Sequence, residues 1–247
     1  MPAGIGTMKI RGRLYRMKKV NTKYLSIIVM LVLVLAVASM ASAFTGSLSS
    51  PVASGVDGNG LWVTSSTATK ITWAVTLSSG VWHYNYKLEV PKSDISHIVI
   101  EASASFKKSD ILNFCVNQGS VGSYSVETFN APPPGNPGQQ PNPYMPGNIY
   151  GIKFDDTSGE TLEFSFDSYR TPVWGDFYAK GGNTGGAPNS AWNAGFLADD
   201  PMSAAADGSQ GFHILVPDTN AVPEPASIIA LVVGVTGLFF RSKTRYA

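Results

Sequence analysis

The feature that most constrains the fold is a strict alternation of apolar and polar residues over positions 71–90. Large apolar side chains occupy every second position on both sides of a short linker, 78–80: Ile71, Trp73, Val75, Leu77, Trp82, Tyr84, Tyr86, Leu88 and Val90. Successive side chains of a strand point to opposite faces, so this period predicts two half-buried antiparallel strands. A three-residue linker that contains glycine predicts that the two strands form a hairpin.

Weaker alternation predicts further short strands at 97–102, 113–116, 123–129, 150–154, 162–166, 174–180 and 212–216. The acidic turn 155–160 predicts that 150–154 and 162–166 form a second hairpin. No long apolar period of 3.6 residues occurs between 44 and 221. We therefore expect an all-β fold, a single antiparallel β-sandwich of jelly-roll-like form, flanked by an N-terminal signal helix and a C-terminal hydrophobic helix.

Composition divides the chain around this sandwich, which we place at 69–216. Residues 44–68 are rich in Ser, Gly and Thr and are expected to be a flexible lead-in, and 181–188 and 217–221 are expected to be a flexible loop and an exit linker. Residues 131–148 contain seven prolines. Proline has no N–H to donate to a sheet, so this stretch predicts an exposed loop with polyproline character. A boundary between two domains is the alternative.

Charge is partitioned along the 247 residues, although the net charge of the whole chain is only +1. Residues 1–43 hold seven basic residues and no acidic one, whereas residues 44–223 hold eight basic and sixteen acidic residues. The middle of the chain is therefore acidic, with a net charge of −8. An acidic domain disfavours nucleic acid and anionic lipid as partners.

The N-terminal 43 residues have the order of a secretory signal peptide. Lys18, Lys19 and Lys23 precede an apolar run at 25–40, and Ala41-Ser42-Ala43 follows as a small-x-small cleavage site. Cleavage after Ala43 by signal peptidase would leave Phe44 as the first residue. Residues 1–16 are then an upstream extension or a long basic region, since Met17 also fits as a start. A retained membrane anchor is the alternative.

The C-terminal 26 residues have a second ordered pattern. Val222-Pro223-Glu224-Pro225 leads into an apolar run at 226–240, and the basic residues Arg241, Lys243 and Arg245 follow. Fifteen helical residues span about 22 Å, shorter than the hydrocarbon core of about 30 Å. The positive-inside rule would keep the basic end cytoplasmic and place the Pro-Glu-Pro at the outer face of the inner membrane.

This C-terminal arrangement resembles the PEP-CTERM sorting domain of exported bacterial surface proteins. The resemblance covers 222–247 and implies recognition by exosortase, a membrane-embedded cysteine enzyme of the transpeptidase type, with cleavage near the Pro-Glu-Pro. It also implies a cell-surface or secreted location, reached through the inner membrane, in bacteria that make exopolysaccharide and biofilm. The middle regions of such proteins vary, so the tail indicates where the protein goes and not what it does. An ordinary C-terminal membrane anchor is the alternative.

Few residues of the middle region suggest chemistry. Cys115 is the only cysteine, which excludes an internal disulfide, and its apolar neighbours predict a buried, inert thiol. His83, His97 and His213 have no metal-ligand spacing, and solvated positions are predicted for His83 and His213. No serine-hydrolase, zinc-protease, P-loop or dinucleotide motif occurs, so we expect no catalytic residue and no cofactor.

Carboxylates in predicted turns are candidates for a calcium site. Asp155, Asp156 and Glu160 lie in one turn, and their oxygen atoms are the hard ligands that Ca²⁺ prefers. Their spacing is not that of a known calcium loop, so a solvated turn is the favoured interpretation. Asp199-Asp200 permits the same two interpretations, and we expect no metal.

Aromatic residues near the end of the middle region are candidates for sugar contacts. Trp174 and Trp192 are the leading ones, and they lie in sequence among further aromatic, acidic and amide residues: Tyr169, Tyr178, Asp176, Asn189 and Asn193. Aromatic faces with amide partners suit stacking on sugar rings, although packing in the core is the favoured interpretation for large aromatics.

These patterns favour a non-enzymatic exported surface or matrix protein with a structural or adhesive role. A carbohydrate-binding module that holds extracellular polysaccharide is the alternative. A secreted hydrolase is disfavoured by the missing motifs, and a plain membrane-anchored protein differs only in the fate of the tail.

Overall fold

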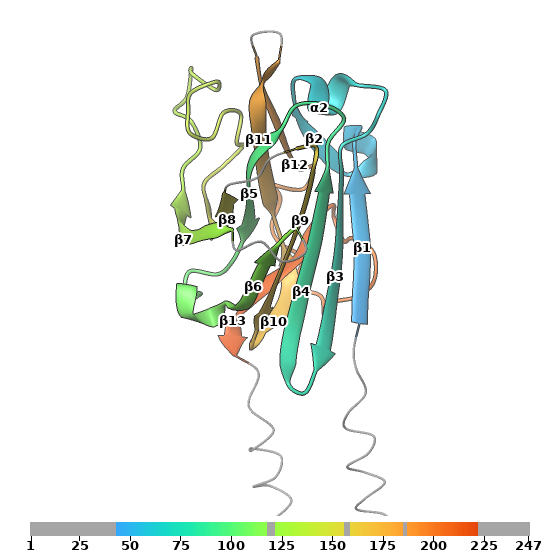
Figure 1. Cartoon of the computed structure of the whole chain (residues 1–247), viewed down its shortest axis with the longest axis vertical. Helices are drawn as coiled ribbons and strands as arrows, with labels where there is room; N and C mark the ends of the chain where they lie inside the picture. Colours follow the sequence, from blue (N-terminus) through green and yellow to red (C-terminus); the bar gives the residue numbers. More distant parts are fainter. Residues whose placement is uncertain (1–42, 118–121, 156–158, 185–186, 222–247) are drawn as a thin grey trace, which may run out of the picture. The chain divides into compact units, whose positions relative to one another are not determined.

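The structure, a computed structural model, describes residues 43–117, 122–155, 159–184 and 187–221. The predicted signal peptide up to Ser42, the acid Asp156 and the predicted sorting signal at 222–247 lie outside the described residues. Within the described part the chain forms a five-stranded and a six-stranded antiparallel β-sheet and a separate two-stranded pair (Figure 1). Both large sheets contribute buried apolar side chains to one core cluster, which confirms the all-β sandwich.

The first sheet has five strands in the order β1-β3-β4-β9-β6. Their bounds are Ala43–Ser49 (β1), Lys70–Ser78 (β3), Val81–Glu89 (β4), Thr161–Ser168 (β9) and Leu112–Val116 (β6). The predicted hairpin is confirmed as β3 and β4, which pair from Lys70 with Glu89 to Ser78 with Val81. Ser79 and Gly80, which form its turn, both have positive φ, at 52° and 80°, as a tight hairpin turn requires.

The second sheet has six strands in the order β2-β12-β11-β5-β8-β7. Their bounds are Val56–Asn59 (β2), Ala187–Asn193 (β12), Phe177–Thr184 (β11), Ile95–Glu101 (β5), Ile149–Asp155 (β8) and Ser123–Phe129 (β7). A separate antiparallel pair is formed by β10, Arg170–Gly175, and β13, Ile214–Ala221. Short helices lie between strands: η1, Val52–Ser54; α2, Leu61–Thr64; and η2, Lys108–Asp110.

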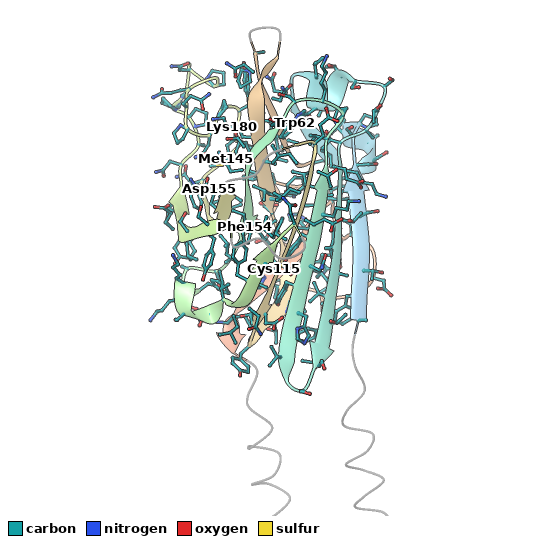
Figure 2. The ribbon with its side chains drawn as sticks, viewed as in Figure 1. Trp62, Cys115, Met145, Phe154, Asp155 and Lys180 are labelled. Atoms are coloured by element: carbon teal, nitrogen blue, oxygen red, sulfur yellow. The ribbon has the colours of Figure 1, made fainter. Side chains whose placement is uncertain are left out.

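Aromatic side chains fill the space between the sheets. Trp82, Tyr84, Tyr86 and Leu88 of β4 are buried, as their alternation predicts. Phe154 of β8, labelled in Figure 2, packs against Phe164 of β9 with ring centroids 4.2 Å apart. Because β8 and β9 belong to opposite sheets, this contact crosses the sandwich.

The predicted second hairpin is wrong, because its two strands, β8 and β9, lie in different sheets. β8 pairs with β5 and β7, whereas β9 pairs with β4 and β6. The chain therefore crosses from one sheet to the other between Asp155, the end of β8, and Thr161, the start of β9, rather than folding back beside itself. Both strands bury alternate apolar side chains, and those of β8 pack against those of β9 across the core.

The segments predicted to be flexible are largely part of the sandwich. The lead-in 44–68 contains β1, β2 and α2, and Val56 and Trp62 within it are fully buried. Trp62 donates its indole N–H to the Lys92 carbonyl at 2.9 Å, which anchors α2. The predicted linker 217–221 is the second half of β13, and the predicted loop 181–188 contributes to β11 and β12. Backbone pairing to neighbouring strands orders these segments despite their weak apolar patterns.

The proline-rich segment 131–148 contains no strand and connects the adjacent, paired strands β7 and β8, so it is not a boundary between two domains. It is not a fully exposed loop either, since Asn142 and Met145 are buried. Met145 packs with Tyr178 and Phe196 in a second apolar cluster. The Tyr178 hydroxyl donates to the Pro143 carbonyl at 2.7 Å and holds the segment against the second sheet.

Candidate functional site

The described residues contain one group of side chains that could hold a metal ion, formed by Asp176, Asp200 and His213. Asp176 lies between the end of β10 and the start of β11, His213 directly precedes β13, and Asp200 lies in the connection between β12 and β13. One ligand atom from each residue falls within 4.8 Å of the others. The pairing of β10 with β13 brings Asp176 and His213 together although 36 residues separate them in the sequence.

His213 is the centre of this cluster. Its Nε2 atom lies 3.5 Å from Oδ1 of Asp176 and 3.5 Å from Oδ1 of Asp200. The imidazole is 0% exposed, so the predicted solvated position of His213 is wrong. Gly195 allows this burial, because a Cβ at position 195 would approach Cε1 of His213 to 2.8 Å.

Hydrogen bonds hold Asp176 in place. Asn193, the last residue of β12, donates its Nδ2 hydrogen to Oδ1 of Asp176 at 2.6 Å and accepts the Phe177 N–H at 2.9 Å. The Asp176 N–H donates to Oε2 of Glu101 at 2.8 Å, which brings a third carboxylate to the edge of the cluster. Asp176 is therefore fixed from both β5 and β12.

The cluster concentrates negative charge in a partly dry environment. Burial, together with Glu101 and Asp200, raises the pKa of Asp176 to about 8 against the opposing effect of the Asn193 hydrogen bond. Burial and the charge of Asp200 raise the pKa of Glu101 to about 7. Burial also raises the pKa of Asp200, which His213 partly offsets. The carboxylates therefore disfavour simultaneous ionisation unless a cation joins them.

A cavity of about 340 Å³ adjoins the cluster, and Glu101, Trp174, Asp200 and Met202 are among its lining residues. Trp174, one of the two predicted sugar contacts, is only 2% exposed. Its ring faces are thus covered, which excludes it as a stacking platform in this conformation. The favoured interpretation of Trp174, packing in the core, is confirmed.

Trp192, the other predicted sugar contact, lies in a different hollow. A groove of about 490 Å³ runs between the proline-rich segment and the outer part of the second sheet, and it is lined by Tyr144, Trp192, Leu197, Asp57 and several prolines. Trp192 of β12 is partly buried, and its neighbours in the sheet are Asp57 and Tyr178. The groove therefore combines two aromatic side chains with a carboxylate.

Tyr144 reaches the groove from a strained backbone. Its φ is 62°, in the left-handed region that costs a residue with a side chain about 1–2 kcal/mol. The Tyr144 N–H donates to the Pro137 carbonyl at 2.6 Å, which closes the turn that holds this conformation. The proline-rich segment thus presents an aromatic ring at a fixed position.

The other candidates from the sequence lie apart from both hollows. Asp155 forms an ion pair with Lys153 at 3.2 Å and Glu160 is exposed; because Asp156 lies outside the described residues, the calcium set stays a prediction. Cys115 is partly exposed rather than buried, because β6 is an edge strand. His83 lies on the surface of β4, where its Nδ1 is 2.5 Å from Oδ1 of Asp167.

Sequence reasoning singled out Asp176, Asp200 and His213, but for separate reasons and without grouping them. No local spacing signals the cluster, since its members come from two connections between strands, β10–β11 for Asp176 and β12–β13 for Asp200 and His213. The same holds for Tyr144, which only the folded proline-rich segment brings near Trp192.

The arrangement of its sheets places the chain in the class of all-β sandwich proteins. Comparison with known protein families, with curated proteins and with solved structures finds no match for this chain. In the part of the chain that the structure describes, no helix is both long and apolar enough to cross a membrane.

Proposed function

We propose that this chain is an exported cell-surface or matrix protein with a structural or adhesive role, sorted and cleaved by exosortase through its Pro-Glu-Pro signal. The observation that carries the proposal is the fixed order of Pro223-Glu224-Pro225, apolar run and basic end, after an N-terminal export pattern. The strand bounds support it. Signal cleavage after Ala43 removes one residue of β1, and cleavage near Pro223 leaves β13, which ends at Ala221, intact.

Mass analysis of the mature surface protein tests this sorting. In cells with exosortase we expect a species that starts at Phe44 and lacks 226–247, and in cells without it a species that keeps the tail. A variant with Glu224→Ala should accumulate with its tail, whereas Glu127→Ala on the surface of β7 should be processed normally. Retention of 226–247 in mature protein from exosortase-containing cells would refute processing.

Glycan binding is the second candidate, and the groove beside the proline-rich segment favours it. Trp192 and Tyr144 offer aromatic surface, and Asp57 offers a hydrogen-bond acceptor for sugar hydroxyls. The groove is open and positioned by rigid elements, as suits a polysaccharide chain better than a small buried ligand. Adhesion would then follow from holding matrix polysaccharide.

Affinity electrophoresis of the full chain against exopolysaccharide tests this groove. Trp192→Ala should weaken retention about fivefold or more, because truncating a central aromatic contact typically costs above 1 kcal/mol. Tyr169→Ala is the matched control, since Tyr169 is an aromatic residue that is 51% exposed and lies outside the groove-lining set. Equal retention of the Trp192→Ala variant and the wild type would exclude the groove as the binding surface.

A further inference from the structure

The hydrogen bonds of His213 fix which of its nitrogens carries a proton. Nδ1 lies 3.2 Å from the backbone carbonyl oxygen of Gln210, which can only accept a hydrogen bond. Nδ1 is therefore the protonated nitrogen. In the neutral imidazole this leaves Nε2 with a free lone pair, the form in which histidine binds metals.

This lone pair has no hydrogen-bond donor facing it among the described residues. Nε2 of His213 is buried and has no hydrogen-bond partner among the described residues. The groups it faces, Asp176 and Asp200, present carboxylate oxygens at 3.5 Å, beyond ordinary hydrogen-bond length. A buried polar atom without a partner is unfavourable, and the two facing carboxylate oxygens add repulsion to its lone pair.

The distances suit a metal ion placed between the three atoms. Zn²⁺ binds nitrogen and oxygen at about 2.0–2.1 Å, so neighbouring ligands of a tetrahedral site lie about 3.3 Å apart. The two separations from His213 Nε2 are 3.5 Å each. The third ligand, Asp200, has a side chain that is 46% exposed and is free to adjust, whereas Asp176 is held by Asn193.

The surroundings also match those of a bound metal. Metal-binding histidines usually donate their other N–H to a carbonyl or carboxylate, as His213 does to Gln210, and ligating carboxylates are hydrogen-bonded in turn, as Asp176 is by Asn193. For the described residues, the ion pairs of Asp176 and Asp200 involve His213 and neither Lys nor Arg. In the part of the chain that the structure describes, no Lys or Arg forms an ion pair with Asp176 or Asp200 in the place that a cation would fill.

We propose that Asp176, Asp200 and His213 bind one divalent transition-metal ion, with Zn²⁺ the best fit to one imidazole and two carboxylates. Ca²⁺ and Mg²⁺ prefer all-oxygen sites, so the imidazole selects against them. The ion joins Asp176, at the β10–β11 junction, to Asp200 and His213 of the connection 194–213. It therefore holds this connection against the β10–β13 pair.

Titration calorimetry on the untagged, chelator-treated full chain tests the proposal, with Zn²⁺, Ca²⁺ and Mg²⁺ as separate probes. We expect one Zn²⁺ per chain, and Ca²⁺ and Mg²⁺ at least 100-fold weaker. Co²⁺ bound in place of Zn²⁺ should give the strong visible absorption of a tetrahedral site. His213→Gln should abolish both signals.

Further variants separate loss of the site from loss of folding. Asp200→Asn changes a half-exposed side chain, so it should fold and bind Zn²⁺ at least tenfold more weakly. His83→Gln removes the surface histidine that also lies beside an aspartate, and it should leave the stoichiometry unchanged. The proposal is overturned if Zn²⁺ does not bind, if His83→Gln removes the binding, if Asp200→Asn binds as the wild type does, or if Ca²⁺ binds more tightly than Zn²⁺.

Discussion

Two buried histidines lie in opposite electrostatic surroundings. His97 of β5 is 5% exposed and His213 is 0% exposed, and Nε2 of each lacks a hydrogen-bond partner among the described residues. Around His97, burial and the charges of Lys153 and Lys180 lower its pKa to about 4. Around His213, the neighbouring charges are the carboxylates of Asp176 and Asp200.

The comparison teaches that neighbours from other strands determine what a buried imidazole does. Burial is the main cause of the lowered pKa of His97. Lys153 of β8 and Lys180 of β11, the two strands that flank β5, lower it further. An added cation at His97 would meet two lysines, whereas an added cation at His213 would meet two carboxylates. We therefore assign His97 to packing beside Tyr178, whose ring centroid is 6.1 Å away, and His213 to metal binding.

The largest expected effect is stabilisation by the metal at only one of these histidines. Zn²⁺ at 100 times its dissociation constant should stabilise the folded state by about 2.7 kcal/mol, because it binds the folded state alone. For a sandwich of this size the midpoint should rise by about 5–10 °C in a thermal scan. His97→Gln should keep this shift and His213→Gln should lose it. An equal shift in both variants would remove the distinction between the two regions.

The second-largest expected effect is a loss of folding stability in acid that arises from the lowered pKa of His97. Its folded-state pKa of about 4 lies below the ordinary value of 6.5, so the unfolded state binds more protons between these values. Stability from this residue is therefore present above pH 6.5 and falls as the pH drops toward 4. The raised pKa values of Asp176 and Glu101 act in the opposite direction over the same pH range in both proteins, so the effect of His97 is measured as a difference between them. From pH 7 to pH 5 the wild type should lose about 2 kcal/mol relative to His97→Gln in denaturant titrations. Equal pH profiles in the two proteins would contradict the assignment.

A smaller effect on Zn²⁺ affinity should distinguish Asn193, the buried amide near His213, from Asn142, the buried amide near His97. Asn193→Ala removes the hydrogen bond to Asp176 and should weaken Zn²⁺ affinity about tenfold, or about 1.4 kcal/mol. Asn142→Ala is the control at the other region, where its Nδ2 donates to the Asn130 carbonyl at 3.1 Å. Calorimetry should find Zn²⁺ affinity unaltered in this second variant. Similar affinity losses in both would indicate a general loosening of the fold.

The smallest effect concerns the field at His97. Lys153→Met removes one positive charge, so the pKa of His97 should rise and the acid-induced loss should shrink by a few tenths of a kcal/mol. Asp155→Asn breaks the same ion pair with Lys153 but keeps the lysine charge. This control should not reduce the acid-induced loss. A reduction in both variants would mean that the ion pair, and not the charge, sets the pH dependence.

Local pattern was sufficient for the β3–β4 hairpin but not for the pairing of β8. The alternation in Ile71–Leu77 and in the strand that follows can be read from neighbouring residues alone. Because only a short turn joins these two strands, each is the nearest strand available to pair with the other. Alternation in 150–154 and 162–166 is equally clear, yet it is compatible with pairing side by side or with packing face to face. The contact of Phe154 with Phe164 across the core selects the second arrangement.

The strands that sequence reasoning missed are poor in large apolar residues. β1, β2 and β12 contain mainly Ser, Gly, Thr, Ala and Asn, and they form because the backbone of a neighbouring strand is available for pairing. The candidate metal cluster was equally inaccessible, since Asp176 and His213 meet only when β10 pairs with β13. Trp192, one of the two residues predicted as possible sugar contacts, lines the groove with Tyr144, whereas Trp174, the other, is buried.

The pairing of β2 with β12 has a consequence for how the chain reaches its native state. Asn59 pairs with Ser190, so this edge of the second sheet cannot form until 131 further residues have been made and brought back. Sandwiches dominated by such distant pairings fold in about milliseconds to seconds, far more slowly than helical proteins of similar size. Until β12 pairs with it, β2 has no neighbour in its sheet among the described strands. This edge of the second sheet is therefore expected to form after the β3–β4 hairpin, whose two strands are joined by a short turn.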